Sequence, residues 1–301
     1  MSITHLEQIL EVVRTKSKKR LAAAYANDVH TIEALYSAIT HGVIVATLVG
    51  DENIIRTNCD KLGINPDCFT IINEPTDTKA AAKAVMLVRA GECQLLMKGL
   101  VSTDKYMRAI LNKEVGLLDP GSILSHVAII ENPRYHKLLI CSDIAVIPNP
   151  DLREKVAMTN YCVKVAKTLG ITEPKVAILG ASEQVLVKMH ATVDAAILSK
   201  MADRRQIKDC LIDGPMALDI AIDKEAAVTK NVKSPVAGDA DCLIFPNIEA
   251  GNIFYKTNTK LAGCEVAAVV VGTKAPCILS SRGDSVQTKL YSIALGALLA
   301  D

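Results

Sequence analysis

The chain contains no tryptophan, and its 301 residues include only three phenylalanines and seven tyrosines. Proteins that bind sugars or single-stranded nucleic acid by stacking need exposed aromatic rings, so both ligand classes are disfavoured. Neither sign of charge is in excess, because 34 Lys and Arg residues oppose 33 Asp and Glu residues. Without a net field that would attract nucleic acid or an anionic membrane, any anion binding must be local.

Metal-ligand spacing and long apolar runs are also missing. The nine cysteines are widely scattered, with no CxxC pair and no zinc-ligand motif. Their odd number and their apolar surroundings are typical of reduced, buried thiols in a cytoplasmic protein. No run approaches the roughly 18 uncharged apolar residues that predict a membrane-spanning helix. The amphipathic pattern of residues 1–20, which ends in basic residues, is not that of a signal peptide.

The sequence does contain the pattern of a layered α/β protein. Hydrophobic residues make up 50% of the chain, enough for a sizeable core and two domains. Short apolar runs alternate with helical periodicity, as in VIVATLVG at 43–50 before a helix near 52–62. This rhythm predicts mainly parallel sheets. Two prolines in VIPNPD at 146–151 mark the expected junction. The predicted parts are a first α/β domain over 1–148, a second over 149–283 and a C-terminal helix over 284–301.

One candidate anion site lies in LLMKGLVSTDKYMRAIL at 95–111. A strand that ends at Lys98 is followed by Ser102 and Thr103 at the start of a helix expected near 103–114. Backbone N–H groups, two hydroxyls and an ammonium then surround one point. The alternative is that these hydroxyls only cap the helix. The spacing matches neither a Walker loop nor a GxGxxG motif. Arg108 lies farther along the helix. Its position alone does not distinguish contact with a ligand from exposure to solvent.

The most informative segment runs from residue 237 to 289. Its apolar runs LIFP and EVAAVVVG each lead into small or polar residues, which is where open α/β sheets bind ligands. SSRGDS at 280–285 places a guanidinium beside hydroxyls and a glycine, a set that suits phosphate and a developing oxyanion. The alternative is a helix start capped by Asp284 or Ser285, with the arginine at the surface. The polar side chains expected to be exposed along the whole stretch are Asn247, Glu249, Asn252, Lys256, Ser281, Arg282 and Asp284.

Two other polar positions favour structural roles. His126 lies within the predicted strand SHVAIIE, and a lone strand histidine is more often a structural group than a catalytic base. Asp213 and Asp219 lie on different helical faces, so a paired-carboxylate site is not favoured there. Asp213 is instead expected to cap a helix or bond a loop.

Several long segments resemble the phosphate acetyl/butyryltransferase family: GPMALDIA, SPVAGDADCLIFPNIEAGNIFYK, APCILSSRGDS and LYSIALGAL. Others resemble its phosphate butyryltransferase branch: MKGLVST, LNKEVGL, SHVAI and DAAILSKMADR. The likeness extends over nearly the whole chain. It implies an enzyme that moves a short acyl group, butyryl preferred, reversibly between coenzyme A and inorganic phosphate.

The same resemblance implies an architecture and a set of ligands. The expected fold is two α/β domains with mainly parallel sheets around an interdomain cleft, as in isocitrate and isopropylmalate dehydrogenases. The protein is expected to be a homodimer or a higher homo-oligomer. Coenzyme A and phosphate are substrates, and neither a redox cofactor nor a metal is implied for the chemical step.

The resemblance also places residues in the cleft. Ser281 and Arg282 match family positions, and Arg108 matches another family arginine with slightly different spacing. Arg282, with Arg108 or Lys98, would neutralise the phosphate, and Ser281 would hydrogen-bond the carbonyl oxygen as it becomes an oxyanion. The predicted substrate-binding residues are Lys98, Ser102, Thr103, Arg108, Asn252 and Lys256.

The thiol base is the point at which the sequence departs from its relatives. A coenzyme A thiol must lose its proton to attack an acyl phosphate. Acetyl-specific relatives carry an acidic residue where this chain has Thr288. Asp284 is the nearest carboxylate, and we include it with Ser281 and Arg282 in the predicted catalytic set, although its motif position does not assign it as the base.

Three alternatives to butyryl transfer remain. The same reaction on acetyl groups is close, because one methylene contributes only about 1 to 3 kcal/mol to specificity. A dehydrogenase of the isocitrate type needs a dinucleotide site and a metal-binding carboxylate cluster, and neither is recognisable. A catalytically inactive coenzyme A-binding module is favoured only by Thr288 at the acidic position.

Overall fold

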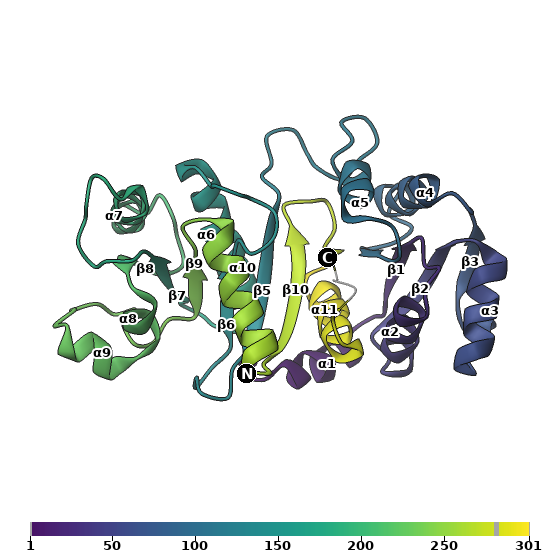
Figure 1. Ribbon diagram of the computed structural model, residues 1–301, viewed down its shortest axis with the longest axis horizontal. Coiled ribbons are helices and arrows are strands. Elements are labelled where there is room, and N and C mark those ends of the chain that lie inside the picture. Colours follow the sequence, from purple (N-terminus) through teal and green to yellow (C-terminus); the bar gives the residue numbers. More distant parts are fainter. Residues whose placement is uncertain (1, 280–282, 301) are drawn as a thin grey trace. The chain divides into compact units, whose positions relative to one another are not determined.

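The structure is a computed structural model that describes residues 2–279 and 283–300. It divides into two compact units. Unit 1 joins the N-terminal segment as far as Leu6 to Ser125–Val266, and unit 2 joins Glu7–Leu124 to the segment from Ala267 onward. Helices and strands alternate in both, with mainly parallel pairing (Figure 1). The α/β class predicted from the sequence is confirmed.

Unit 2 contains a sheet in the order β3-β2-β1-β4-β11-β10. All neighbouring pairs up to β11 are parallel, and β11 pairs antiparallel with β10. The central strands are buried on both faces, as the uniformly buried Leu21 to Ala24 illustrate, so they appear in the sequence as unbroken apolar runs. The strands are β1 (Lys19–Ala24), β2 (Ile44–Gly50), β3 (Thr70–Asn73), β4 (Leu95–Lys98), β10 (Glu265–Val271) and β11 (Cys277–Ile278).

The helices of unit 2 form two groups that contact different neighbours. One group consists of α2 with α3 and α11, and the other of α4 with α5. Segments far apart in the sequence therefore meet where α11 lies beside α2 (Figure 1). The hydroxyl of Tyr291 on α11 also lies 3.2 Å from a carboxylate oxygen of Glu7. The helices are α1 (Leu6–Arg14), α2 (Val29–Thr40), α3 (Glu52–Leu62), the short 3-10 turn η1 (Pro66–Cys68), α4 (Asp77–Arg89), α5 (Thr103–Ile110) and α11 (Val286–Leu299).

Unit 1 contains a sheet in the order β5-β6-β9-β7-β8. Only β5 pairs antiparallel, with β6, and the remaining pairs are parallel. The connection from β6 to β7 runs through α6, and the connection from β7 to β8 runs through α7. The elements are β5 (Ser125–Glu131), β6 (Leu139–Ser142), α6 (Leu152–Thr168), β7 (Lys175–Leu179), α7 (His190–Asp203), β8 (Leu211–Met216), α8 (Leu218–Ile222), α9 (Lys224–Thr229), β9 (Cys242–Ile244), α10 (Ile248–Lys256) and the π-helical turn η2 (Thr257–Leu261).

The division into units differs from the junction that the prolines predicted. The expected first domain ended at residue 148, whereas β5 and β6 belong to unit 1 with the later strands. The reason is pairing, because Ile140 of β6 aligns with Cys242 of β9. Pro148 and Pro150 lie in the loop between β6 and the N-cap of α6, so they mark a strand-to-helix turn. Residues 267–279 likewise belong with the first strands and not with the expected second domain.

In the described ranges, none of the helices combines the length and the apolarity needed to cross a membrane.

Candidate functional site

Parallel pairing brings several loops to one edge of the sheet in unit 2. Ala24 of β1 aligns with Lys98 of β4, and Ile278 of β11 aligns with Met97. The chain therefore leaves β11 next to Lys98. Strand order also reverses between β1 and β4, the point at which open α/β sheets bind ligands. We call the loops that follow β1, β2, β4 and β11 the carboxyl edge of unit 2.

Lys98 is buried at this edge, with only 5% of its surface exposed. Its Nζ donates to the carbonyl oxygens of Gly99 at 3.2 Å and Val101 at 3.1 Å, so the ammonium is folded against its own loop. Gly99 is required by close packing, because a Cβ there would lie 2.4 Å from the carbonyl oxygen of Tyr25. Tyr25 itself has a φ of 59°, in the left-handed region. The loops after β1 and β4 are therefore in backbone contact.

The start of α5 carries the next group of predicted residues. Ser102 is the N-cap, and its hydroxyl accepts from the backbone N–H of Lys105 at 3.4 Å. Thr103 follows at the first helical position, and both side chains are exposed. The capping role named as the alternative is thus present, and it leaves Thr103 and the helix N-terminus at the edge. The side chain of Arg108 is 79% exposed and pairs with Asp104 at 3.1 Å.

Ser281 and Arg282, the residues with the largest predicted roles, lie outside the described residues. The strand before them is fixed by Tyr106 of α5, whose buried hydroxyl donates to the carbonyls of Ile278 at 3.3 Å and Leu96 at 3.4 Å. Burial raises the pKa of Tyr106 well above its usual value, so the hydroxyl stays a donor. Tyr106 therefore ties the helix that carries Thr103 to the strand that leads to Ser281.

The segment after Arg282 begins α11. Ser285 is the N-cap, and its hydroxyl oxygen accepts from the backbone N–H of Thr288 at 3.0 Å. The Ser285 hydroxyl also donates to the Thr288 hydroxyl at 3.1 Å. Thr288 thus completes a helix cap at the position where the family resemblance led us to expect an acid. Asp284 lies half-buried immediately before this cap.

Asn27 also lies at this edge and was not predicted from the sequence. Its side-chain oxygen accepts from the N–H of Asp51 at 3.0 Å, and its carbonyl accepts from Asn58 at 3.1 Å. Its Nδ2 is buried without a hydrogen-bond partner in the described part of the chain. Gly50 makes room for it, because a Cβ there would lie 2.1 Å from the Asn27 oxygen. Asn27 therefore locks the loops after β1 and β2 together, and no motif announces that role.

In unit 1 the parallel strands β6, β9, β7 and β8 also end at one edge. We call the loops that follow these strands the carboxyl edge of unit 1. Asp143, directly after β6, is 1% exposed and accepts four hydrogen bonds. The donors are the Ser125 hydroxyl at 2.7 Å and three backbone N–H groups, of His126 at 2.8 Å, Ala145 at 2.8 Å and Val146 at 2.7 Å. A carboxylate surrounded in this way fixes the loop, and His126, whose backbone donates to it, is 4% exposed.

Helix α10 places Asn252 at this edge. The side chain of Asn247 caps the helix by accepting from Ala250 N at 3.0 Å. Gly251 lets the helix approach the β6–α6 loop, because a Cβ there would lie 2.2 Å from the carbonyl oxygen of Asp143. Asn252 then donates to the Ile144 carbonyl at 3.1 Å. Lys256 lies one turn farther along, with its Nζ 5.1 Å from the ring centre of Tyr255.

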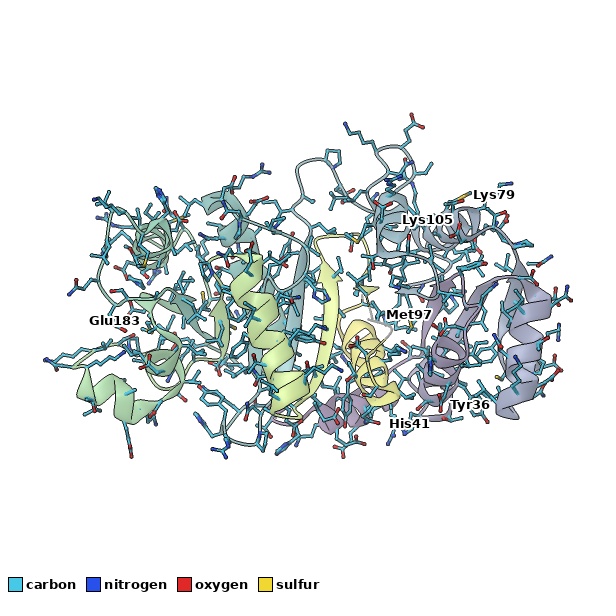
Figure 2. The ribbon with its side chains drawn as sticks, in the orientation of Figure 1. Tyr36, His41, Lys79, Met97, Lys105 and Glu183 are labelled. Carbon is cyan, nitrogen blue, oxygen red and sulfur yellow. The ribbon has the colours of Figure 1, made fainter. Side chains whose placement is uncertain are left out.

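Two ion pairs between helices were not anticipated from the sequence. Lys155 of α6 lies 2.6 Å from Asp194 of α7 in unit 1. Lys105 of α5, labelled in Figure 2 near α4, lies 2.6 Å from Asp77 in unit 2. In each pair the partners lie within the first two turns of helices that follow the carboxyl ends of strands. Sequence gives no signal for either, because the partners are far apart in the chain.

A third charged contact fixes the loop that follows β7. Glu183, labelled in Figure 2, lies 3.4 Å from Lys230, which also lies 3.0 Å from Asp219 of α8. The hydrogen bond from Lys230 lowers the pKa of Asp219, so the carboxylate remains charged. The β7 and β8 loops of the edge are thereby joined.

The cysteines are free thiols, mostly buried. Burial raises the pKa of Cys277 to about 12 and that of Cys210 to about 11, so both thiols are protonated at neutral pH. The two least buried, Cys68 and Cys210, are only partly exposed. The expectation of buried, reduced thiols agrees with this arrangement. In the ranges that the structure describes, we find no cluster of three or more His, Cys, Asp or Glu side chains that could hold a metal ion.

Comparison with known proteins identifies the family. Residues 74–297 match the family model described as phosphate acetyl/butaryl transferase. Phosphate butyryltransferase of Clostridium acetobutylicum is 47% identical over 99% of both chains, and phosphate acetyltransferase of Thermotoga maritima is 45% identical over 98% of this chain and 99% of its own.

Solved structures of other proteins have a similar fold. A branched-chain phosphotransacylase from Enterococcus faecalis matches with a TM-score of 0.83 and 28% identity, covering 93% of this chain and 98% of its own. A 4-hydroxythreonine-4-phosphate dehydrogenase from Klebsiella pneumoniae, 11% identical with a TM-score of 0.54, covers 95% of this chain and 100% of its own and shares the fold alone. The resemblance found in the sequence is confirmed, and the chain belongs to the phosphate acetyl/butyryltransferase family.

Proposed function

We propose that this enzyme moves a short acyl group, butyryl preferred, reversibly between coenzyme A and inorganic phosphate. The observation that carries the proposal is the 47% identity over 99% of the chain with a phosphate butyryltransferase. The acetyl alternative is supported by the 45% identity with a phosphate acetyltransferase. Because one methylene is worth only about 1 to 3 kcal/mol, we expect activity on several short acyl groups.

The chemical step is a direct acyl transfer. In the direction of acyl-CoA formation, the coenzyme A thiolate attacks the acyl carbon of the acyl phosphate. A carbon–sulfur bond forms. The bond between the acyl carbon and the oxygen that bridges to phosphorus breaks, and phosphate leaves with the electron pair. Negative charge grows on the carbonyl oxygen and on the leaving phosphate, so cations and hydrogen-bond donors at these two points lower the barrier.

We assign phosphate to the carboxyl edge of unit 2. Arg282 would bind two phosphate oxygens at once, and Ser281 would donate to the carbonyl oxygen. Thr103 and the N-terminus of α5 supply further donors beside Ser102, and Lys98 holds their loop. Arg108 would first have to leave Asp104, so its contribution is secondary. This assignment is supported by the alignment of β11 with β4, which starts the 279–282 segment next to Lys98.

Asp284 is the proposed thiol base. It precedes the α11 cap and is half-buried, and Thr288 is committed to that cap. Asp284→Asn should lower the rate of acyl transfer to coenzyme A. An unchanged rate would assign the base elsewhere.

We assign acyl-CoA to the carboxyl edge of unit 1, where Asn252 and Lys256 lie on α10. Coenzyme A and phosphate serve as substrates, and the proposed chemistry uses neither a cofactor nor a metal. We further propose a homodimer or higher homo-oligomer and a cytoplasmic location, with no nucleic acid or membrane partner, as the sequence predicted.

Phosphate-dependent release of coenzyme A from a series of acyl-CoA donors tests the function. We expect kcat/KM to be highest for butyryl-CoA. A maximum at acetyl-CoA would support the acetyl alternative. Tight coenzyme A binding without phosphate-dependent release from any short donor would instead identify an inactive binding module.

A further inference from the structure

A buried lysine of unit 1 has no role in the reaction as described so far. Lys155 of α6 is 5% exposed, and its Nζ lies 2.6 Å from a carboxylate oxygen of Asp194 on α7. Asp194 is 24% exposed, so the carboxylate reaches the surface and the ammonium does not. The pair joins two helices, and its two residues are 39 positions apart in the chain.

The pair lies close to the carboxyl edge of unit 1. Lys155 is in the first turn of α6, which begins at Leu152, and Asp194 is in the second turn of α7, which begins at His190. At about 1.5 Å of rise per residue, both lie within roughly one turn of the loops that connect these helices to β6 and β7. In the sheet, β9 lies between β6 and β7, the strands that precede the two helices, and β9 leads to Asn247 and α10.

Stability alone does not account for this pair. An ammonium in the first turn of a helix is opposed by the helix dipole, and its burial carries a desolvation cost. Well-packed apolar residues in place of a buried ion pair are often neutral or stabilising. What an ion pair supplies beyond apolar packing is a fixed distance between two particular atoms.

The loop that this geometry fixes suits the acyl end of acyl-CoA. The buried Thr192, two residues before Asp194, holds the β7–α7 loop by accepting from Leu186 N at 2.8 Å and donating to Met189 O at 2.8 Å. The loop exposes apolar side chains, with Val185 55% and Val187 82% exposed. Apolar side chains at a ligand-binding edge favour an acyl chain and its thioester arm over inorganic phosphate.

We propose that Lys155 and Asp194 are positioning residues for acyl-CoA. The ion pair sets the distance between α6 and α7 and thereby the places of the loops after β6 and β7. The proposal rests on the proposed function, because it takes the carboxyl edge of unit 1 as the acyl-CoA half of the site. Neither residue is assigned a part in bond making or breaking.

The decisive variant replaces both charges, Lys155→Met with Asp194→Leu. We expect a folded protein with a denaturation midpoint near that of the wild type, because no lone buried charge remains. Displaced loops should raise the KM for butyryl-CoA by about tenfold or more, since small misplacements in a site have large effects. The KM for phosphate should change little. Lys155→Arg, which keeps a cation opposite Asp194, should retain the wild-type KM for butyryl-CoA.

The matched control is Lys200→Met with Asp203→Leu, which removes an exposed pair of the same 2.6 Å length at the other end of α7. It should leave both KM values unchanged. If the buried double variant fails to fold, Asp194→Asn, which removes the carboxylate charge with little change of shape, decides the question. A wild-type KM for butyryl-CoA in the folded double variant, or in Asp194→Asn, overturns the proposal.

Asn252→Ala separates this proposal from the function on which it rests. If Asn252→Ala raises the KM for butyryl-CoA and the double variant does not, the edge binds acyl-CoA and the ion pair does not position it. If neither changes that KM, the assignment of acyl-CoA to unit 1 is itself wrong.

Discussion

The ion pairs of the two units have the same length and different surroundings. Lys155 and Asp194 in unit 1, and Lys105 and Asp77 in unit 2, both meet at 2.6 Å near the carboxyl edge of their sheet. Lys155 is 5% exposed, whereas Lys105 is 42% exposed. Water screens the charges of Lys105 and Asp77, and it solvates either one when its partner is removed. It does not solvate the buried ammonium of Lys155 in this way. Burial, and not distance, therefore decides which pair the protein depends on.

The largest expected effect concerns the carboxyl edge of unit 2, to which phosphate is assigned. Arg282→Ala should lower kcat by about two to three orders of magnitude, roughly 3 kcal/mol in the barrier, because one charge-stabilising donor is lost. Steady-state kinetics with varied phosphate would measure this. Arg108→Ala is the matched variant and should have a much smaller effect, since its guanidinium already pairs with Asp104 at the surface. Equal losses in both variants would contradict the assignment of Arg282.

Removal of one partner from each ion pair tests the role of burial. Asp194→Ala leaves the buried Lys155 ammonium uncompensated and should lower the free energy of unfolding by about 3 to 5 kcal/mol. Asp77→Ala should leave it nearly unchanged, even though the Lys105 hydrogen bond lowers the pKa of Asp77. Urea denaturation of the two variants would compare them. Similar losses would show that exposure does not separate the pairs.

Glycine substitutions test how tightly each carboxyl edge is packed. Gly99→Ala in unit 2 and Gly251→Ala in unit 1 would place a Cβ 2.4 Å and 2.2 Å from a backbone carbonyl oxygen. Overpacking of this kind should lower the free energy of unfolding by about 1 to 3 kcal/mol in each case. Gly63→Ala provides a contrast, since no atom lies within 4 Å of its added Cβ and only its φ of 65° opposes the change. Thermal unfolding that ranks Gly63→Ala as the most damaging would contradict the packing explanation.

The smallest expected effect concerns the opposite edge of unit 1, where no substrate is assigned. Burial raises the pKa of Asp239, but hydrogen bonds from Lys175, Lys137 and His136 outweigh it and hold that pKa well below the usual value. A lowered folded-state pKa gives stability that is full above the unfolded value and is lost as the pH falls below it.

Denaturation of the wild type and of Asp239→Asn between neutral pH and pH of about 3 would measure this dependence. Asp239→Asn should have a lower free energy of unfolding than the wild type at neutral pH, and this difference should become smaller as the pH falls. A difference that grows in acid would contradict the ion network as its cause.

Local patterns predicted the regular elements well. The apolar run at 43–50 contains β2 (Ile44–Gly50), and the helix expected near 52–62 is α3 (Glu52–Leu62). Both depend on residues close in sequence, namely an apolar run buried on two faces and a helix capped by Asp51. The helix expected near 103–114 ends earlier, at Ile110, because Asn112 accepts from the N–H groups of Glu114 and Val115 and forms a turn.

The candidate site was predicted only in part. The motif around Lys98 and Thr103 correctly marked the end of β4 and the start of α5. It gave no sign that Lys98 would bond its own loop or that Arg108 would pair outward with Asp104. Asn27 and Lys155 were missed, because a lone asparagine and a lone lysine in the first turn of a helix are ordinary sequence features.

The sequence by itself determined the family, the α/β class and the helix caps, because these follow from long motifs and from contacts between near neighbours. The tertiary structure decided that β5 and β6 belong with the later strands, since strand pairing joins residues about a hundred positions apart, as Ile140 and Cys242 show. It also decided that Lys155 is buried against Asp194 while Lys105 stays partly exposed. Burial is a property of the packed helices and not of the residues that form them, so no local pattern can specify it.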